Sequence, residues 1–302
     1  MCIFHFSFAA GGVILCLQTG KSLIGGWKTM IQFENVTKTY AGGKVKAVDG
    51  LDMKIEEGKV FGFIGPNGAG KTTTLKIIMG IDSPDSGQVQ YAKDCQVGYL
   101  EQETNLEQKD TTILAEVMAA AKEIRRMGER ANELQAQITE LSEQGKDVDA
   151  LLNEYGQVQD RFEHLGGYEL ESNARKILSG LGFKVTDFER PCSEFSGGWQ
   201  MRIALAKLFL RHPDLLLLDE PMVGLDPQSV FMLKEEMRRH ADSGRTVFFS
   251  THVLDVAERL CDEIGIIKRG RLIARGTLDE LRHGGDSSLE EVFLELVEKK
   301  GE

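Results

Sequence analysis

The feature that most constrains the fold is a glycine-rich run at residues 65–72, which follows an apolar segment and precedes a helical pattern. The apolar segment, residues 60–64, is typical of a short buried strand, and residues 72–79 are typical of a helix that stops at Gly80. In the order strand, loop, helix, the spacing G-x-x-x-x-G-K-T marks a phosphate-binding loop. The run therefore predicts an α/β fold built around a nucleotide triphosphate.

In such a loop, glycines let backbone N–H groups wrap a phosphate, and the helix N-terminus favours its negative charge. Lys71 is expected to reach the β- and γ-phosphates, and the Thr72 hydroxyl to bind Mg²⁺. The nucleotide-binding residues predicted from this run are Gly65, Pro66, Asn67, Gly68, Ala69, Gly70, Lys71, Thr72 and Thr73.

A second feature is the apolar run at residues 215–218, which ends in Asp219 and Glu220. A charge at the end of a buried strand costs free energy unless it is used, so packing alone does not explain the pair. Asp219 is placed to hold Mg²⁺, directly or through water, and Glu220 to polarise the attacking water for in-line displacement. The pair therefore adds hydrolysis to nucleotide binding.

Strand and helix patterns alternate along much of the chain, which predicts a mainly parallel sheet covered by helices. Further strands are expected at residues 31–36, 45–55 and 246–250, with a closing hairpin at 263–267 and 271–274. Further helices are expected at residues 197–210, 229–240, 253–260 and 289–297, and a turn at 83–87.

Residues 121–165 have a different pattern, with apolar residues three or four positions apart in two stretches that a polar, glycine-containing segment separates. That spacing predicts two helices, each with one narrow apolar stripe, in an antiparallel hairpin about 30 Å long. Six basic and ten acidic residues lie in this segment, so it carries no strong basic stripe. The pattern fits both a hairpin that packs only on itself and an arm that contacts a partner.

The net charge of −11 opposes nonspecific binding to nucleic acid or to an anionic membrane, and we expect no DNA partner. Five scattered cysteines without CxxC spacing are expected to be free thiols in a reducing cytoplasm. Residues 1–29 include an apolar stretch that is too short to span a bilayer and has no basic residue before it. We expect Met30 to be the true start and residues 1–29 to be an extension without function, with a weak peripheral membrane contact as the alternative.

Four more motifs follow along the chain, namely Gln102, Ser196-Gly197-Gly198, Asp226 and His252. Together with the loop and the carboxylate pair, they resemble those of ATP-binding-cassette (ABC) ATPases over about residues 31–275. The resemblance implies an α/β P-loop NTPase of ABC type, with a mainly parallel core sheet, an antiparallel β subdomain and a helical subdomain that carries the hairpin. It places the ATPase domain at residues 30–275 and a C-terminal helical tail at 276–302.

Within one cassette, the resemblance implies that Tyr40 stacks on the adenine of ATP. Gln102 would sense Mg²⁺ and the γ-phosphate, and His252 would contact the γ-phosphate as a switch. The catalytic residues would then be Glu220, His252 and Gln102, and the Mg²⁺ ligands Thr72, Gln102 and Asp219.

Between two cassettes, the resemblance implies that Ser196, Gly197 and Gly198 contact the γ-phosphate bound by the partner, with a helix N-terminus behind them. Asp226 would communicate across the same interface. Two ATP molecules would thus join two cassettes, which we expect to be a homodimer, and hydrolysis would release them.

The chain resembles two subfamilies in different parts. Residues 30–87 and 221–297 are similar to the ATPase subunits of bacterial exporters, whereas residues 95–215, hairpin included, look more like the ABC-F proteins that act on ribosomes. Transporter subunits usually have Leu and Gln where this chain has Phe195 and Trp199. Met222 departs from the Thr common in both groups, and a composite sequence joined at shared segments is one hypothesis.

Two classes of function remain open from the sequence. As a transporter motor, the chain would hydrolyse ATP on the cytoplasmic, inner face of the cell membrane. It would bind beneath a separate transmembrane permease and would power export. As an ABC-F-like translation factor, it would bind ribosomes through the hairpin. The single cassette, the acidic charge and the exporter-like tail favour the transporter; an inactive hybrid is a third reading.

Overall fold

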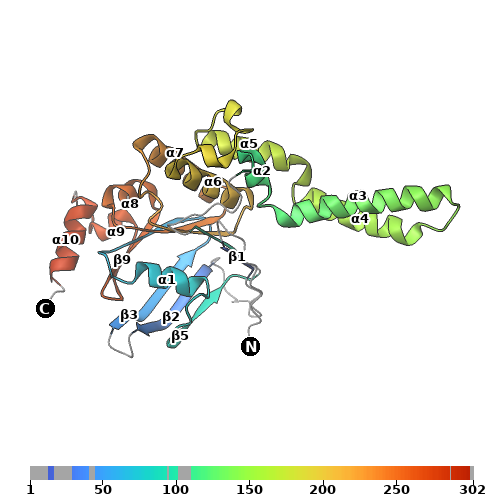
Figure 1. Ribbon diagram of the computed structural model, residues 1–302. Helices are drawn as coiled ribbons and strands as arrows, with labels where there is room; N and C mark the ends of the chain where they lie inside the picture. Colours follow the sequence, from blue (N-terminus) through green and yellow to red (C-terminus); the bar gives the residue numbers. More distant parts are fainter. Residues whose placement is uncertain are drawn as a thin grey trace. The chain divides into compact units, whose positions relative to one another are not determined.

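The computed structural model divides the chain into two compact units, residues 1–107 with 212–302 and residues 108–211 (Figure 1). The residues that it describes are 13–16, 29–40, 45–93, 95–100, 110–285 and 287–299.

The first unit is built on a seven-stranded sheet with the order β1-β6-β7-β8-β4-β9-β10. Its inner pairs, from β6 to β9, are parallel, and the two outer pairs are antiparallel. Every residue of β4, β7 and β8 is buried, as expected for parallel strands covered on both faces. The predicted mainly parallel core sheet is therefore confirmed, with β1 (Val13–Cys16), β4 (Val60–Ile64), β6 (Gln96–Leu100), β7 (Leu215–Asp219), β8 (Thr246–Thr251), β9 (Glu263–Lys268) and β10 (Arg271–Gly276).

Strand β1 comes from the segment expected to lack function. It pairs with β6 from Val13 opposite Tyr99 to Cys16 opposite Gln96. That residues 1–29 have no function stays a prediction.

A second, antiparallel sheet has the order β3-β2-β5, with β2 (Thr29–Tyr40), β3 (Val45–Glu56) and β5 (Ser86–Tyr91). The sequence patterns predict the first two strands, with shorter limits. They do not predict β5, because residues 86 and 87 are typical of a turn and its mostly polar sequence has no buried apolar run. One core cluster joins the two sheets to helix α1 (Lys71–Ile78) and includes Phe33, Ile55, Phe63, Leu75 and Phe248.

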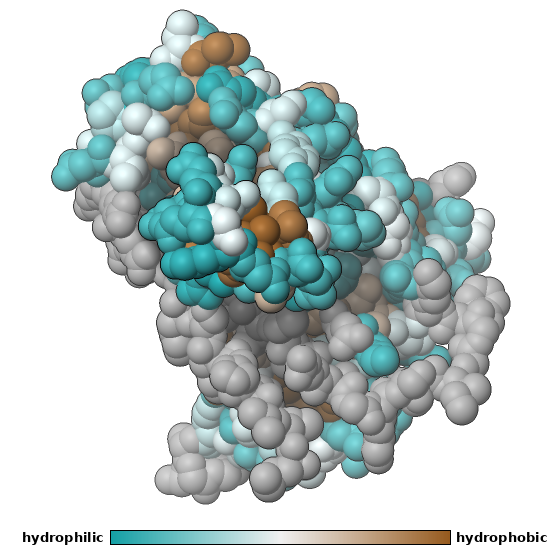
Figure 2. Space-filling view, turned by 90° about the vertical axis from the view of Figure 1, so that its right-hand side faces the viewer, coloured by the Kyte–Doolittle hydropathy of each residue, from teal (hydrophilic) through white to brown (hydrophobic). Residues whose placement is uncertain are grey.

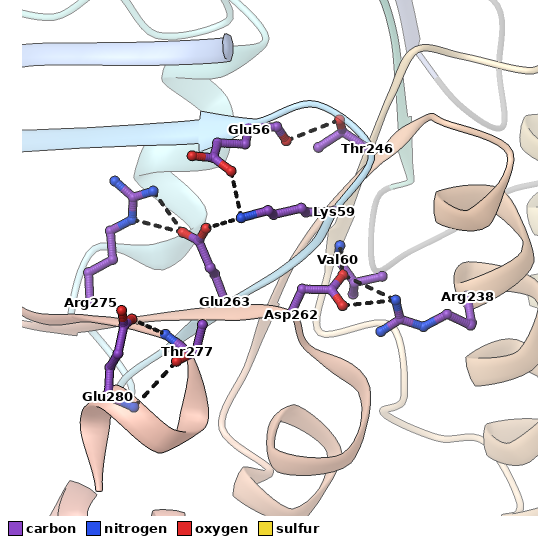
Figure 3. Close-up of polar contacts among 10 residues, drawn as sticks. All are labelled: Glu56, Lys59, Val60, Arg238, Thr246, Asp262, Glu263, Arg275, Thr277 and Glu280. Carbon is purple, nitrogen blue, oxygen red and sulfur yellow. Dashed lines mark hydrogen bonds and ion pairs between the residues drawn. The ribbon is translucent and has the colours of Figure 1, made fainter. Parts of the chain in front are cut away.

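A charged network lies at the end of β4 opposite the glycine-rich loop (Figure 3). Lys59 Nζ forms an ion pair with Glu263 at 2.5 Å, and Arg275 forms a second ion pair with Glu263 at 2.7 Å. The backbone N–H of Val60 donates to Asp262 at 2.7 Å, and the carboxylate of Asp262 binds Arg238. These contacts connect the starts of β4 and β9, and the glycine-rich loop follows the opposite, carboxyl end of β4. The helices of this unit are α1, α7 (Pro227–Asp242), α8 (Leu254–Leu260), α9 (Leu278–Leu281) and α10 (Leu289–Lys299).

The second unit is helical, with a long hairpin that extends beyond its other helices (Figure 1). The hairpin helices α3 and α4 agree with the two helices predicted within residues 121–165. Helices α2 and α5 are not predicted by the sequence patterns. The helices are α2 (Ile113–Met118), α3 (Lys122–Glu143), α4 (Asp149–His164), α5 (Leu170–Gly180) and α6 (Gly197–Leu210).

The hairpin arms are antiparallel (Figure 1), and two ion pairs connect them. Leu134 is the one fully buried residue of α3, and α4 has none. Arg130 pairs with Glu154 at 2.6 Å, and Arg161 pairs with Glu123 at 2.7 Å. On the face drawn in Figure 2, the residues that the structure describes are mostly hydrophilic, with small hydrophobic areas among them.

Candidate functional site

The site of the first unit is formed where three neighbouring parallel strands end. Strand β8 lies between β7 and β4, with Asp219 opposite Ser250 and Ile64 opposite Thr251. The carboxyl ends of parallel strands meet at one edge of a sheet, where α/β proteins bind ligands. Strand order therefore brings together the glycine-rich loop, the carboxylate pair and His252. The end of the loop at residue 72 and His252 are 180 positions apart in the sequence.

The loop is shaped by glycines that lie against other backbone segments. A Cβ atom on Gly65 would lie 2.3 Å from the carbonyl oxygen of Ile267, and one on Gly70 would lie 2.1 Å from that of Ala47. Gly70 also has a φ of 108°, which only glycine adopts readily, and it caps α1. These close approaches leave residues 66–68 and Thr72 exposed at the helix N-terminus, which fits a bound phosphate.

Lys71 lies at the first position of α1 with its ammonium group directed back over the loop. Its Nζ atom donates to the carbonyl oxygens of Gly65 at 2.8 Å and Pro66 at 3.4 Å. The same atom lies 3.4 Å from Glu220 Oε1, and both side chains are largely buried. The structure thus joins the two halves of the sequence prediction through one ion pair.

Glu220 has a left-handed backbone, with a φ of 48°, which is uncommon for a residue with a side chain. Its backbone N–H donates to the carbonyl oxygen of Ser250, and its carboxylate lies 2.8 Å from His252 Nδ1. Glu220 is therefore held between Lys71 on one side and His252 on the other. Strained backbone of this kind is concentrated at functional sites, where surrounding contacts maintain it.

Asp219 is buried and accepts a hydrogen bond from Ser250 Oγ at 2.5 Å. Mg²⁺ prefers oxygen ligands, and the carboxylate of Asp219 and the exposed hydroxyl of Thr72 supply that chemistry. Ser250 was missed from the sequence. The signal available was a hydroxyl residue at the end of the apolar pattern 246–250.

Tyr40, the last residue of β2, is partly exposed, and its hydroxyl group donates to Asp82. Lys38 Nζ lies 5.6 Å from the centre of its ring. Burial raises the pKa of the Tyr40 hydroxyl above its ordinary value, and the Asp82 contact adds to the rise. A hydrogen bond with the Thr73 side chain brings Tyr40 next to the first turn of α1.

Gln102 lies outside the described residues. Strand β6, which precedes it, ends with Leu100 paired to Leu218 of β7.

In the second unit, Ser196 is the N-cap of α6, and Gly197 and Gly198 form its first turn. The Ser196 side chain makes no capping hydrogen bond, and a Cβ atom on Gly197 would meet nothing within 4 Å. Ser196 and Gly197 are exposed at the start of this 14-residue helix, whose first N–H groups have no partner within the helix.

The two residues that depart from the transporter pattern have a packing role beside this helix end. The rings of Phe183 and Trp199 are 4.8 Å apart, and those of Phe183 and Phe195 are 5.8 Å apart. The guanidinium of Arg202 lies 3.9 Å from the Trp199 ring centre and donates to the carbonyl oxygen of Leu181. All of these residues lie within 95–215, the part whose motifs in the sequence resemble those of ABC-F proteins.

Asp226 has a local role that the sequence reasoning did not assign. It is the N-cap of α7, accepts from the N–H of Ser229 at 3.0 Å and also binds the Ser229 hydroxyl, with Pro227 beginning the helix. Its expected role between cassettes stays a prediction.

No helix in the described part of the chain is long and apolar enough to cross a membrane. The sequence model of a family described as ABC transporter matches residues 48–223. Nod factor export ATP-binding protein I of Paraburkholderia xenovorans is 32% identical over 256 residues, which are 82% of this chain and 70% of that protein. ABC transporter F family member 2 of Arabidopsis thaliana is 36% identical over 205 residues, which are 68% of this chain and 30% of that protein.

Solved structures show the same fold. The ATP-binding subunit of an ABC transporter aligns with a TM-score of 0.65 at 24% identity, covering 89% of this chain and 99% of that one. A dimeric bacterial ABC transporter cassette aligns with a TM-score of 0.58 at 22% identity, covering 82% of this chain and 99% of that one.

Proposed function

The chain belongs to the ABC transporter family, and from this premise we propose that it is the ATP-hydrolysing subunit of an exporter that powers a separate membrane permease. The observation that carries the proposal is the convergence of Lys71, Asp219, Glu220 and His252 on the glycine-rich loop. The exporter assignment is supported by the relative of exporter type, most of whose length this chain spans.

In this proposal, the phosphates of ATP replace Glu220 and the loop carbonyls as partners of Lys71 Nζ. The carboxylate of Glu220, released from that ion pair, orients and polarises the water that attacks the γ-phosphate. His252 contacts Glu220 already and lies at the edge of the site, where it can report on the γ-phosphate. Tyr40 presents its ring to the adenine.

Mg²⁺, held by Thr72, Asp219 and Gln102, would neutralise charge that develops on the phosphate oxygens. Ser250 supports this role because its hydroxyl fixes one oxygen of the Asp219 carboxylate.

The second half of the site comes from a second copy of the chain. Ser196, Gly197 and Gly198 of one copy contact the γ-phosphate held by the other, because the N-terminus of α6 offers N–H groups and a favourable dipole. Asp226 communicates across that interface. The homodimer acts at the cytoplasmic face of a membrane, beneath the permease.

A second candidate function, that of an ABC-F-like factor on ribosomes, is supported by the α3–α4 hairpin and by the plant relatives of that class. The chain spans only 30% of the length of the first of those relatives, so this support covers one part of them. An inactive hybrid of the two classes is the third reading.

The two functions are separated by affinity capture from the producing cells in the presence of ATP. The bait is Glu220→Gln, which should hold ATP without turnover, and the matched control is Lys71→Ala, which should lose nucleotide binding. Capture of a multi-span membrane protein by the bait alone supports the exporter subunit. Capture of ribosomal subunits by the bait alone supports the second function and contradicts the first.

A further inference from the structure

The turn between β9 and β10 lies directly against the phosphate loop. Arg269 and Gly270 both have positive φ angles, of 47° and 80°, as in the two-residue turns that join antiparallel strands. The N–H of Gly270 donates to the carbonyl oxygen of Ala69 at 2.9 Å. Ala69 is buried between the exposed loop residues and α1, so this bond fixes the loop at its last turn before the helix.

The same glycine is bound on its other side by the small antiparallel sheet. Its carbonyl oxygen accepts from the N–H of Asp49 in β3 at 2.9 Å. The carboxylate of Asp49 also binds Arg271, the first residue of β10, at 2.7 Å, and Lys46 at 3.0 Å. Hydrogen bonds from Lys46 and then Arg271 hold the pKa of Asp49 below its ordinary value, so the carboxylate stays charged.

A side chain at Gly270 would be crowded by the backbone of β3, and its φ of 80° would strain any residue other than glycine. A Cβ atom there would lie 3.0 Å from the carbonyl oxygen of Ala47 and 3.1 Å from the N–H nitrogen of Asp49. Ala47 is also the residue against which Gly70 of the phosphate loop packs. The turn and the loop therefore share one backbone support in β3, and a displacement of the turn is transmitted to the loop.

The C-terminal helix α10 contacts the strand that leads into this turn. Lys268, the last residue of β9, donates from Nζ to the carbonyl oxygen of Val297 in α10. Apolar residues of α10 pack on the cluster that contains Ile64, the last residue before the loop, and Ile266 of β9.

We propose that Gly270 and Lys268 are positioning residues for the phosphate loop, and that α10 holds the turn in place through Lys268. This inference rests on the proposed ATP-binding role of the loop. It assigns to the C-terminal tail an effect on ATP affinity that is transmitted through the turn.

The test compares Gly270→Ala with Gly244→Ala in the full-length protein, by titration with a fluorescent ATP analogue and by steady-state kinetics. Gly244 is a matched control because its φ of 85° is equally left-handed, whereas a Cβ atom there would meet nothing within 4 Å. Gly270→Ala should raise the dissociation constant and KM about tenfold with little change in kcat, and Gly244→Ala should change none of these. Lys268→Met, which keeps the side-chain length and loses the donor, should raise KM in the same direction.

Equal ATP affinities for Gly270→Ala and the wild type would overturn the proposal, as would equal losses for the two glycine variants. If Gly270→Ala does not fold, an unchanged KM in Lys268→Met overturns it. Lys71→Ala, measured in parallel, separates this inference from the proposed function. Should Lys71→Ala keep its affinity for ATP, the proposed function fails and the inference falls with it.

Discussion

Replacing Glu220 by Gln tests the hydrolytic role of the carboxylate without altering its size. The Glu220 side chain contacts Lys71 through Oε1 at 3.4 Å and His252 Nδ1 through Oε2 at 2.8 Å. In the Gln variant the amide oxygen can accept from Lys71, and the amide N–H can donate to a neutral His252 Nδ1. The variant therefore keeps its packing and loses the negative charge. General acid–base assistance contributes roughly 10²- to 10⁴-fold. At about 1.4 kcal/mol per factor of ten, the barrier should rise by about 3–5 kcal/mol.

The measurement is phosphate release at saturating ATP and Mg²⁺, together with ATP affinity. We expect kcat to fall by at least about a hundredfold. ATP affinity should be retained or improved, because Lys71 no longer has a carboxylate competing with the phosphates, and the ATP-bound dimer should persist. Glu235→Gln is the matched control, since Glu235 is an exposed residue of α7 outside the site. A kcat within about threefold of the wild type would refute the assignment of Glu220.

Three further perturbations test the structure around the site. Ser250→Ala removes the hydroxyl that donates to Asp219, so the free energy of unfolding should fall by about 1.5–3 kcal/mol. Half-maximal ATPase activity should then need a higher Mg²⁺ concentration, and an unchanged Mg²⁺ requirement would contradict the role of Ser250 in holding Asp219. Trp199→Ala should cost about 2–4 kcal/mol in urea unfolding because it removes ring packing and the Arg202 contact, and a cost near zero contradicts the aromatic cluster. Burial lowers the pKa of His240 from 6.5 to about 4, so the unfolded chain binds the proton more tightly. The contribution of His240 to the free energy of unfolding should be present above pH 6.5 and should decline by about 3 kcal/mol as the pH falls toward 4. The measurement is the urea midpoint at several pH values across this range, and His240→Gln should flatten the decline.

The agreement between sequence and structure follows the strength of each local pattern. Helix α6 and strand β4 have the predicted limits. In each of them a run of apolar residues is bounded by glycine in the sequence itself, so the local pattern is enough to place its ends. Helix α2 has six residues, which is too short for a clear period, and β5 is a polar edge strand. The pairing of β5 with β2, which no local pattern encodes, makes it a strand.

The aromatic residues beside the signature motif illustrate the same limit. Phe195 and Trp199 are notable in the sequence as departures from a transporter pattern. Only the folded unit shows that Phe183 packs against both, so the departures belong to one cluster. Asp226 likewise has a helix-capping contact that the sequence motif alone did not indicate.

The sequence by itself determined the phosphate loop and the paired carboxylates, because glycines, a helix start and a strand end are local requirements of the chain. The tertiary structure decided which groups meet there. Strand order places Ser250 beside Asp219 and the Gly270 turn beside Ala69, contacts between segments 31 and 201 positions apart. Such contacts depend on the pairing of strands that are distant in sequence, and the side-chain pattern of one strand carries no information about its neighbour.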